Sequence, residues 1–291
     1  MHLLYAACAV SHRLVLLKGT ALIGTVYCPL WWMTVVSLMS ETDAKQSMGS
    51  GEILPVPKSL EWGNYASAIR EVGTDPWSGF LDAMANSIVV TVLVVLGTIL
   101  SSSMVATAFA RIRFRGRNGL FILMLATMML PAQVTMIPLF LLFRSLGWVD
   151  TLLPLVVPAF FGSAFFIFMY RQFIAQIPEA LFEAARIDGC GWLEIWWRIV
   201  LPLCRPVTAI TAVFTFIFVW NDFMSPLIYL HSEDQATIAV ALNSFRTQFG
   251  GIEDVHLLMA LSVITMIPCI VLFFAAQKQF IEGLGAGAVK G

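Results

Sequence analysis

The sequence predicts an all-α integral membrane protein, and two observations support this fold class. The first is composition: 59% of the 291 residues are hydrophobic and only 12% are charged, whereas charged residues make up about a quarter of an ordinary soluble domain. The second is a set of apolar intervals with close to the roughly 20 residues, or more, that a helix needs to cross a bilayer. There are six of them, at residues 19–40, 83–110, 118–143, 151–170, 206–230 and 257–277.

These intervals are expected to be transmembrane helices. Within lipid, a helix satisfies every backbone polar group inside its own segment. A barrel strand would alternate apolar and polar residues at every second position, and the intervals do not. Only the fifth interval contains a charged residue, Asp222.

The distribution of Lys and Arg predicts the orientation, because loops rich in these residues stay in the cytoplasm. With the amino terminus inside, the inside segments hold 12 of the 17 basic residues. We therefore expect both termini in the cytoplasm and the first apolar interval to be a retained helix. The expected parts are a cytoplasmic N-terminal segment (1–18), a six-helix transmembrane domain (19–281) and a cytoplasmic tail (282–291).

The sequence contains no recognisable energy source or catalytic centre. It has no Gly-x-x-x-x-Gly-Lys-Ser/Thr phosphate loop, no Gly-x-Ser-x-Gly elbow and no His-Glu-x-x-His pair. A Cys-x-x-Cys or His-rich cluster that could hold a metal is also missing. The apolar intervals lack the buried carboxylates and histidines of an ion-coupled carrier, apart from Asp222. We expect a non-catalytic chain without a cofactor or metal of its own, and any work on a solute must come from another subunit.

A mixed polar and aromatic segment, residues 178–202, separates the fourth and fifth intervals on the expected cytoplasmic side. Pro178 suits a first helical turn, and Glu179 and Glu183 complement the positive end of the helix dipole. Gly189 can end that helix, and a second helix should begin at Trp192 and end near Pro202. Small alanines beside a glutamate would let a partner surface approach the backbone closely.

A second interpretation of this segment stays open, because helices rich in Trp and Arg commonly lie at the membrane interface. In that case Trp192, Trp196 and Trp197 would sit in the headgroup layer. The spacing of the segment favours the docking interpretation. Glu183-Ala184-Ala185 is followed after three residues by Gly189, after nine more by Ile199, and after one more by Leu201-Pro202.

This spacing closely resembles the cytoplasmic signature loop of binding-protein-dependent ABC importers, where the loop couples the permease to its ATPases. The residues that the resemblance assigns to coupling are Glu183, Ala184, Ala185, Asp188, Gly189, Ile199, Leu201 and Pro202. Other segments resemble the permease subunits of carbohydrate importers for maltodextrins and glycerol 3-phosphate. They are NSIVVT (86–91), ARIRFRGR (110–117), MMLPAQVTMIPLF (128–140), WNDFMSPLI (220–228) and GAGAVKG (285–291).

The resemblance implies a type I ABC importer permease with six transmembrane helices and a cytoplasmic coupling helix between helices 4 and 5. It implies a multi-pass location in the bacterial inner membrane and a second, homologous permease subunit. Two ABC ATPase subunits would use ATP and Mg²⁺, and an extracytoplasmic solute-binding protein would deliver the solute. Besides these proteins and the lipid bilayer, no nucleic acid partner is expected.

The solute path is predicted from polar and aromatic residues at membrane depth. Gln133 and Thr135 follow a proline, and Asn221 and Asp222 follow Trp220, which could stack on a sugar face. For Asn221 and Asp222 a hydrogen-bonded clamp between helices is an equal alternative, because polar residues often join membrane helices. The basic residues at 111–117 need only positive-inside anchoring to explain them.

The predicted function is that of the transmembrane permease subunit of an ATP-driven importer. The solute would be an oligosaccharide, a disaccharide or glycerol 3-phosphate, moved inward by alternating access. The alternative is an ATP-independent six-helix channel or secondary carrier, which would have no ATPase subunits.

Overall fold

The computed structural model describes residues 29–51, 55–71, 78–249 and 254–288, and every regular element in these ranges is a helix. The chain divides into two compact units. The larger one comprises Ser78–Ala241 and Pro268–Gly291, and the smaller one comprises Met1–Trp77 and Leu242–Ile267. The helices α14 (Ile238–Phe249) and α15 (Val255–Ala288) contribute to both.

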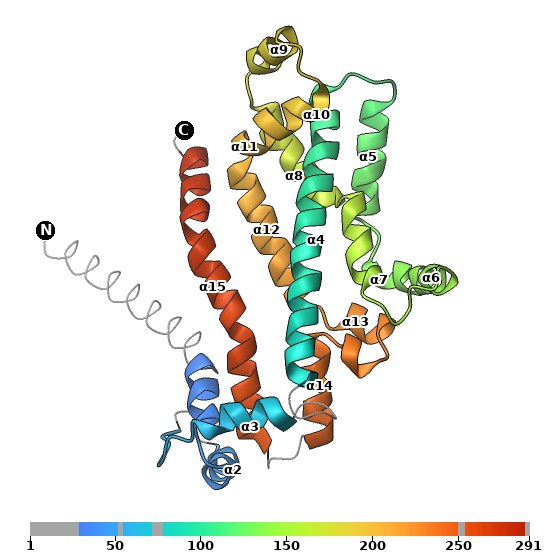
Figure 1. Ribbon diagram of the computed structural model, residues 1–291. Coiled ribbons are helices and arrows are strands. Elements are labelled where there is room, and N and C mark those ends of the chain that lie inside the picture. Colours follow the sequence, from blue (N-terminus) through green and yellow to red (C-terminus); the bar gives the residue numbers. More distant parts are fainter. Residues whose placement is uncertain (1–28, 52–54, 72–77, 250–253, 289–291) are drawn as a thin grey trace, which may run out of the picture. The chain divides into compact units, whose positions relative to one another are not determined.

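The long helix α4 (Ser78–Arg111) is the central element of the larger unit and packs against α8 (Ala164–Ala175) and α12 (Arg205–Trp220) (Figure 1). Three consecutive buried serines of α4 join it to its neighbours. Ser101 Oγ donates to Ala159 O at 2.9 Å, and Ser102 Oγ accepts from Ser163 N–H at 3.2 Å. Ser103 Oγ accepts from the indole N–H of Trp196 at 3.1 Å. Small polar residues let membrane helices approach closely and bond to each other.

The third expected interval, 118–143, is wrong as one helix. It forms α5 (Arg117–Thr127) and α6 (Ala132–Ser145), which meet at an angle of 97°. Pro131 lies at the break with an extended backbone (φ −61°, ψ 137°). The proline ring disfavours a helical conformation for the residue before it, so α5 ends upstream and α6 begins directly after Pro131.

The fourth interval is helical but interrupted, and it extends beyond 170. Its parts are α7 (Leu153–Val156), the 3₁₀ helix η1 (Val157–Phe161) and α8. Gly162 separates η1 from α8 with φ +89°, a conformation that side-chain-bearing residues rarely adopt. Together residues Leu153–Ala175 are long and apolar enough to cross a membrane.

The fifth interval, 206–230, is also wrong as a single helix. The helix α12 ends at Trp220, and a separate short helix, α13 (Met224–Tyr229), follows. At its other end α12 meets the segment Trp192–Leu203 at an angle of 81°. The next elements are η3 (Glu233–Gln235) and α14.

Three described helices are long and apolar enough to cross a membrane, and up to five crossings result if each bent pair counts as one. The three single candidates are Gly79–Arg111, Leu153–Ala175 and Val255–Gln277. They contain the second and sixth expected intervals in full and most of the fourth. Residues 19–28 of the first expected interval lie outside the described residues, and its residues 29–37 are helical.

The smaller unit has its own core around Val36, Met39 and Ala44. It includes α2 (Glu41–Ser50) and α3 (Gly63–Glu71), which lie between the first and second expected intervals. Asn64 of α3 donates from Nδ2 to the carbonyl oxygens of Ser37 at 3.0 Å and Met39 at 2.8 Å. The loop after the first interval is therefore folded onto the end of that interval.

Candidate functional site

The segment with the signature spacing forms a helix, a glycine turn and a second helix, in the predicted order. The first is α9 (Glu179–Ile187), which begins after Pro178. It ends at Ile187, and the chain turns at Gly189, whose φ of +84° requires the freedom of glycine. The Cys190 N–H then donates to Ala185 O at 2.9 Å, a bond typical of a left-handed helix C-terminus. The glycine of the signature thus sets the shape of the turn.

The second helix begins at Trp192 and ends at Leu203, close to Pro202 as predicted, but it is not a regular α-helix. It consists of α10 (Trp192–Ile195), the π-helical turn η2 (Trp196–Val200) and α11 (Leu201–Leu203). A proline collides with the carbonyl four residues earlier in a regular α-helix. Here the Leu201 N–H reaches Trp196 O, five residues back, so the regular spacing is already interrupted where Pro202 enters.

The α9 helix has one buried side and one exposed side. Phe182 is 1% exposed and Ala185 5% exposed, whereas Ile187 is 85% exposed. The other signature residues of this helix and turn are exposed, namely Glu183, Ala184, Asp188 and Gly189. Ala184 is therefore open to a partner surface, whereas Ala185 is buried in the core of the segment.

The signature residues of the second helix have a different environment. Ile199 is half-buried and packs against the core that contains Phe182 and Ala185. Leu201 is half-buried and Pro202 is exposed. Ile199 therefore supports the fold of the segment and is not part of the exposed face of α9.

The predicted headgroup tryptophans also differ from one another. Trp197 is 61% exposed, as an interfacial residue would be. Trp196 donates its indole N–H to Ser103 of α4, and Trp192 lies under the guanidinium of Arg186 at 5.7 Å. Trp196 therefore attaches the segment to α4 directly.

Arg111, the last residue of α4, is a site residue that sequence reasoning missed. Its guanidinium donates to Ile174 O at 2.6 Å and to Ile177 O, at the end of α8. It also pairs with the carboxylate of Glu179 and lies 4.3 Å above the ring of Phe182, both on α9. Positive-inside anchoring does not account for these contacts. The one sequence feature that sets Arg111 apart is that it directly follows the apolar interval, whereas the exposed Arg113 and Arg115 come later.

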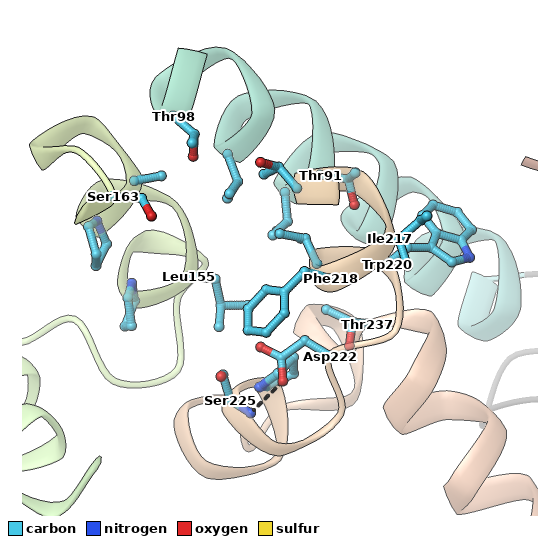
Figure 2. A pocket seen from close by; sticks show the side chains of 18 of the residues that line it. Thr91, Thr98, Leu155, Ser163, Ile217, Phe218, Trp220, Asp222, Ser225 and Thr237 are labelled. Atoms are coloured by element: carbon cyan, nitrogen blue, oxygen red, sulfur yellow. Dashed lines mark hydrogen bonds between the residues drawn. The ribbon is translucent and has the colours of Figure 1, made fainter. Parts of the chain in front are cut away.

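A cavity of about 790 Å³ opens in the larger unit, at the end away from α9. Its walls come from α4, η1 and the start of α8, and from α12 and α13 (Figure 2). The lining includes seven aromatic side chains, namely Phe143, Phe165, Phe166, Phe214, Phe218, Trp220 and Tyr229. Flat rings next to a few polar groups are typical of a ligand pocket.

Two of the five predicted solute-path residues, Trp220 and Asp222, line this cavity. The structure places the other three elsewhere. Gln133 is exposed on α6, and Thr135 donates its hydroxyl to Ala132 O at 3.0 Å. Asn221 is exposed and donates from Nδ2 to Ile217 O at 2.8 Å, within its own helix end.

Asp222 makes a local hydrogen bond at the break between α12 and α13. Its Oδ1 accepts from the Ser225 N–H at 3.1 Å (Figure 2). A carboxylate that accepts a backbone N–H at the start of a helix satisfies one of its unpaired donors. This bond is local to the break, whereas the clamp interpretation requires a bond from Asp222 to another helix.

Three hydroxyl groups of the cavity lining are further candidates that the sequence did not single out. Thr91, Thr215 and Thr237 are each 5% exposed or less. Their hydroxyl oxygens have no hydrogen-bond partner among the described residues. A buried hydroxyl without a partner costs about 1–3 kcal/mol, so a polar ligand that pairs with it would recover that energy. The only feature in the sequence that could have pointed to these hydroxyls is that threonines occur within the apolar intervals.

Near the cavity, Asp150 joins two loops. Its carboxylate accepts the backbone N–H groups of His231 and Ser232 at 2.8 Å each, and the Ser232 hydroxyl. The bond from the Ser232 hydroxyl, then those from the two backbone N–H groups, lowers the pKa of Asp150 from 3.8 to about 2. Its own N–H donates to Tyr229 O at 2.8 Å, and Tyr229 lines the cavity.

Comparison with known proteins identifies the family. The family of binding-protein-dependent transport system inner membrane components matches residues 94–284. The chain is 37% identical over 235 residues to the arabinooligosaccharides transport system permease protein AraQ of Halalkalibacterium halodurans, covering 81% of each chain. It is 32% identical over 278 residues to the melibiose/raffinose/stachyose import permease protein MelC of Bacillus subtilis, covering 94% of this chain and 96% of MelC.

A solved structure agrees with these relatives. The chain is similar to a chain of a bacterial ABC transporter involved in the import of the acidic polysaccharide alginate. The TM-score is 0.78 at 25% identity, and the match covers 92% of this chain and 97% of that one. The chain therefore belongs to the binding-protein-dependent transport system inner membrane components, the non-catalytic permease subunits of ABC importers.

Proposed function

We propose that this chain is one of two homologous permease subunits that move a neutral oligosaccharide or disaccharide into the cytoplasm. Two ABC ATPase subunits supply the work with ATP and Mg²⁺, and an extracytoplasmic solute-binding protein delivers the sugar. The relatives that carry this proposal are named for arabinooligosaccharides and for melibiose, raffinose and stachyose. They match across most of both chains, so the likeness includes the cavity as well as α9.

The proposed topology is six crossings with both termini in the cytoplasm. Residues 19–40 form the first crossing, and 19–281 the whole transmembrane domain. The bent pair Arg117–Thr127 with Ala132–Ser145 counts as one crossing. The fifth crossing contains α12 (Arg205–Trp220) and excludes the segment Trp192–Leu203, which meets α12 at 81°. Residues 1–18 and 282–291 then lie in the cytoplasm, together with the coupling loop 178–202.

The exposed side of α9 is the proposed docking surface for one ATPase subunit. Ile187 is 85% exposed in a helix outside the proposed crossings, and a large apolar side chain in such a place indicates a partner surface. A Cβ at Gly189 would meet nothing within 4 Å, so an ATPase surface can approach its backbone. Closure of the ATPases on ATP would then displace α9 and turn the bundle outward.

The cavity supports a neutral sugar as the solute, in preference to glycerol 3-phosphate or another anion. Its described lining contains the carboxylate of Asp222 and no Lys, Arg or His. An anion would meet a like charge there without a basic partner, and such burial is costly. Ring faces such as Trp220 and the hydroxyls of Thr91, Thr215 and Thr237 suit a polyhydroxylated ring instead.

The docking role is tested with Gly189→Asn, because Asn tolerates the left-handed backbone but adds a side chain to the surface. The matched control is Gly51→Asn, since Gly51 also has a positive φ (+68°) and open space around its Cβ. We expect Gly189→Asn to reduce ATPase co-purification and sugar uptake at least about fivefold, and Gly51→Asn to change neither. Unchanged ATPase binding in Gly189→Asn would show that docking occurs elsewhere.

The solute class is tested by measuring uptake in cells from which the gene for this chain has been deleted, before and after the gene is restored. We expect the chain to restore uptake of labelled raffinose, melibiose or an arabino-oligosaccharide, and not of glycerol 3-phosphate. Restored uptake of glycerol 3-phosphate alone would contradict the neutral-sugar proposal. Uptake by a purified complex without ATPase subunits would instead indicate an ATP-independent carrier or channel.

A further inference from the structure

We propose that Arg111 is the joint that makes α4 follow α9, so that a displacement of α9 reaches the wall of the cavity. Arg111 is then a positioning residue for transport. The proposal rests on the coupling role of α9 given above, and it adds the route by which the displacement passes into the membrane.

The contacts of Arg111 connect three helices at one point. The guanidinium belongs to α4, the carbonyls of Ile174 and Ile177 to the end of α8, and the carboxylate of Glu179 and the ring of Phe182 to α9. The last carbonyls of a helix have no partner within the helix. Arg111 donates to Ile174 O in the last turn of α8, which also accepts the Ile177 N–H, and to Ile177 O just after the helix. The same guanidinium holds Glu179 at the start of α9.

Burial distinguishes Arg111 from the other basic residues of its segment. Its side chain is 9% exposed, whereas Arg113 and Arg115 are exposed. An arginine that only anchors a helix at the membrane surface has no reason to leave water. Its Nε has no hydrogen-bond partner among the described residues, which is a further cost of this position. The position is therefore better explained by what the guanidinium connects than by anchoring.

The route matters because α9 is joined to α8 by the chain but to α4 only through side chains. Residues 176–178 connect α8 to α9 directly. On the α4 side, Ala106, Phe109 and Ala110 pack in the apolar core that also contains Phe182 of α9, and Ser103 bonds to Trp196. Arg111 adds the directional contacts, a salt bridge to Glu179 and hydrogen bonds to two carbonyl oxygens. Without Arg111, α9 can turn about residues 176–178 while α4 stays in place. With Arg111, the ends of α4, α8 and α9 move as one body.

Two of the three helices that meet at Arg111, α4 and α8, reach the cavity. From Arg111, α4 continues without interruption to Thr98 and Thr91, which line it. At about 1.5 Å per residue these positions are roughly 20 and 30 Å from the joint. The other end of α8 contributes Phe165 and Phe166 to the opposite wall. Joint motion of α4 and α8 therefore changes the position of two walls relative to α12.

The experiment uses a cysteine at Ser163 as a reporter of the cavity, in a variant complex whose five native cysteines are replaced. Ser163 lines the cavity and belongs to neither α9 nor Arg111's contacts. The labelling rate by a small thiol reagent is measured on the purified complex, with and without ATP and vanadate. In the complex with Arg111 intact, we expect the rate to change at least about fivefold when the nucleotide is trapped.

Arg111→Gln should abolish this nucleotide response while the ATPase subunits still co-purify, because the docking side of α9 is unchanged. Arg111→Lys should reduce it partly, since lysine keeps the charge but cannot donate from a planar fork. The exposed Arg113→Gln is the control and should respond fully. A purely structural role would lower the yield of complex and leave the response of each assembled complex unchanged.

Three results separate the possible failures. A full response in Arg111→Gln contradicts the proposal. Loss of the ATPase subunits in both Arg111→Gln and Arg111→Lys also contradicts it, because Arg111 would then support the docking surface instead. No response in the complex that retains Arg111 would indicate that the proposed ATP coupling of the cavity is wrong, independently of this residue.

Discussion

Asp150 and Ser232 are joined twice, because the Asp150 carboxylate accepts both the backbone N–H and the hydroxyl of Ser232. This pair connects the loop after α6 to the loop after α13, beside the cavity lining residue Tyr229. The two broken segments of the larger unit are thus held to each other outside the predicted membrane crossings.

Removing the charge of Asp150 should lower the thermal midpoint of the solubilised protein. The pKa of Asp150 is lowered to about 2 in the folded protein, so its stabilisation is complete above its unfolded pKa of about 3.9 and is lost as the pH falls through about 2. The midpoints of the original protein and Asp150→Asn should therefore differ near pH 6 and converge as the pH falls from about 4 to about 2. Asp234→Asn is the control. A pH-independent difference would contradict the pKa assignment.

A side chain at Gly97 should be poorly tolerated, because its Cβ would lie 2.9 Å from ring carbons of Phe160. Overpacking of this kind typically costs about 1–3 kcal/mol. Gly97→Ala should lower the melting temperature in detergent, and Phe160→Leu in the same chain should restore part of it. Gly119→Ala is the matched control for Gly97→Ala, since Gly119 is also helical but its Cβ would meet nothing within 4 Å. Equal melting of the two alanine variants would show that the Gly97 contact is not close.

The proposed orientation predicts which side of the membrane each loop faces. A cysteine at Ile187, which is 85% exposed on α9, should react with an impermeant thiol reagent only from the cytoplasmic side. A cysteine at Glu233, exposed beside the Asp150 loop, should react only from outside. The measurement compares the labelling of each cysteine in intact cells with its labelling in inverted vesicles. The reverse pattern would overturn the topology.

The unpaired hydroxyls of the cavity should matter for the solute rather than for the fold. Thr91→Val, Thr215→Val and Thr237→Val each remove a hydroxyl that has no partner among the described residues, so stability should be unchanged or higher. If a sugar hydroxyl pairs with each group, a net bond of about 1 kcal/mol predicts roughly fivefold weaker apparent affinity in uptake.

Thr211→Val is the control for this series. Thr211 is equally buried on α12, but its hydroxyl donates to Val207 O at 2.9 Å. It should therefore lose some stability and keep its apparent affinity for the sugar. Unaltered uptake kinetics in all three cavity variants would exclude these hydroxyls from the solute path.

The sequence predicts features that depend on local composition and spacing, and misses those that depend on distant partners. The helix α9 and the turn at Gly189 follow from Pro178, the glutamates and a glycine with a positive φ. The breaks after Thr127 and Trp220 are hidden by uniform apolarity, although Pro131 marks the first. Trp220 and Asp222, which line the cavity, stand out in the sequence because a charged residue is rare within an apolar interval.

Arg111 and Ala185 show the limit of this approach. In the sequence Arg111 is one of four alternating basic residues, and only the fold brings Ile174, Glu179 and Phe182 to it. Ala184 and Ala185 are identical neighbours in the sequence. In the helix, Ala184 is exposed and Ala185 lies in the same core as Phe182. Tertiary contacts decide both.

The unbroken length of α4 has a consequence for the surrounding lipid. A helix of 34 residues is about 50 Å long, whereas the hydrocarbon layer is only about 30 Å thick. The helix must either tilt or extend well into the headgroups, and its tilt responds to hydrophobic mismatch. Since α4 forms part of the cavity wall and carries Arg111 at its end, transport should depend on the acyl-chain length of the bilayer.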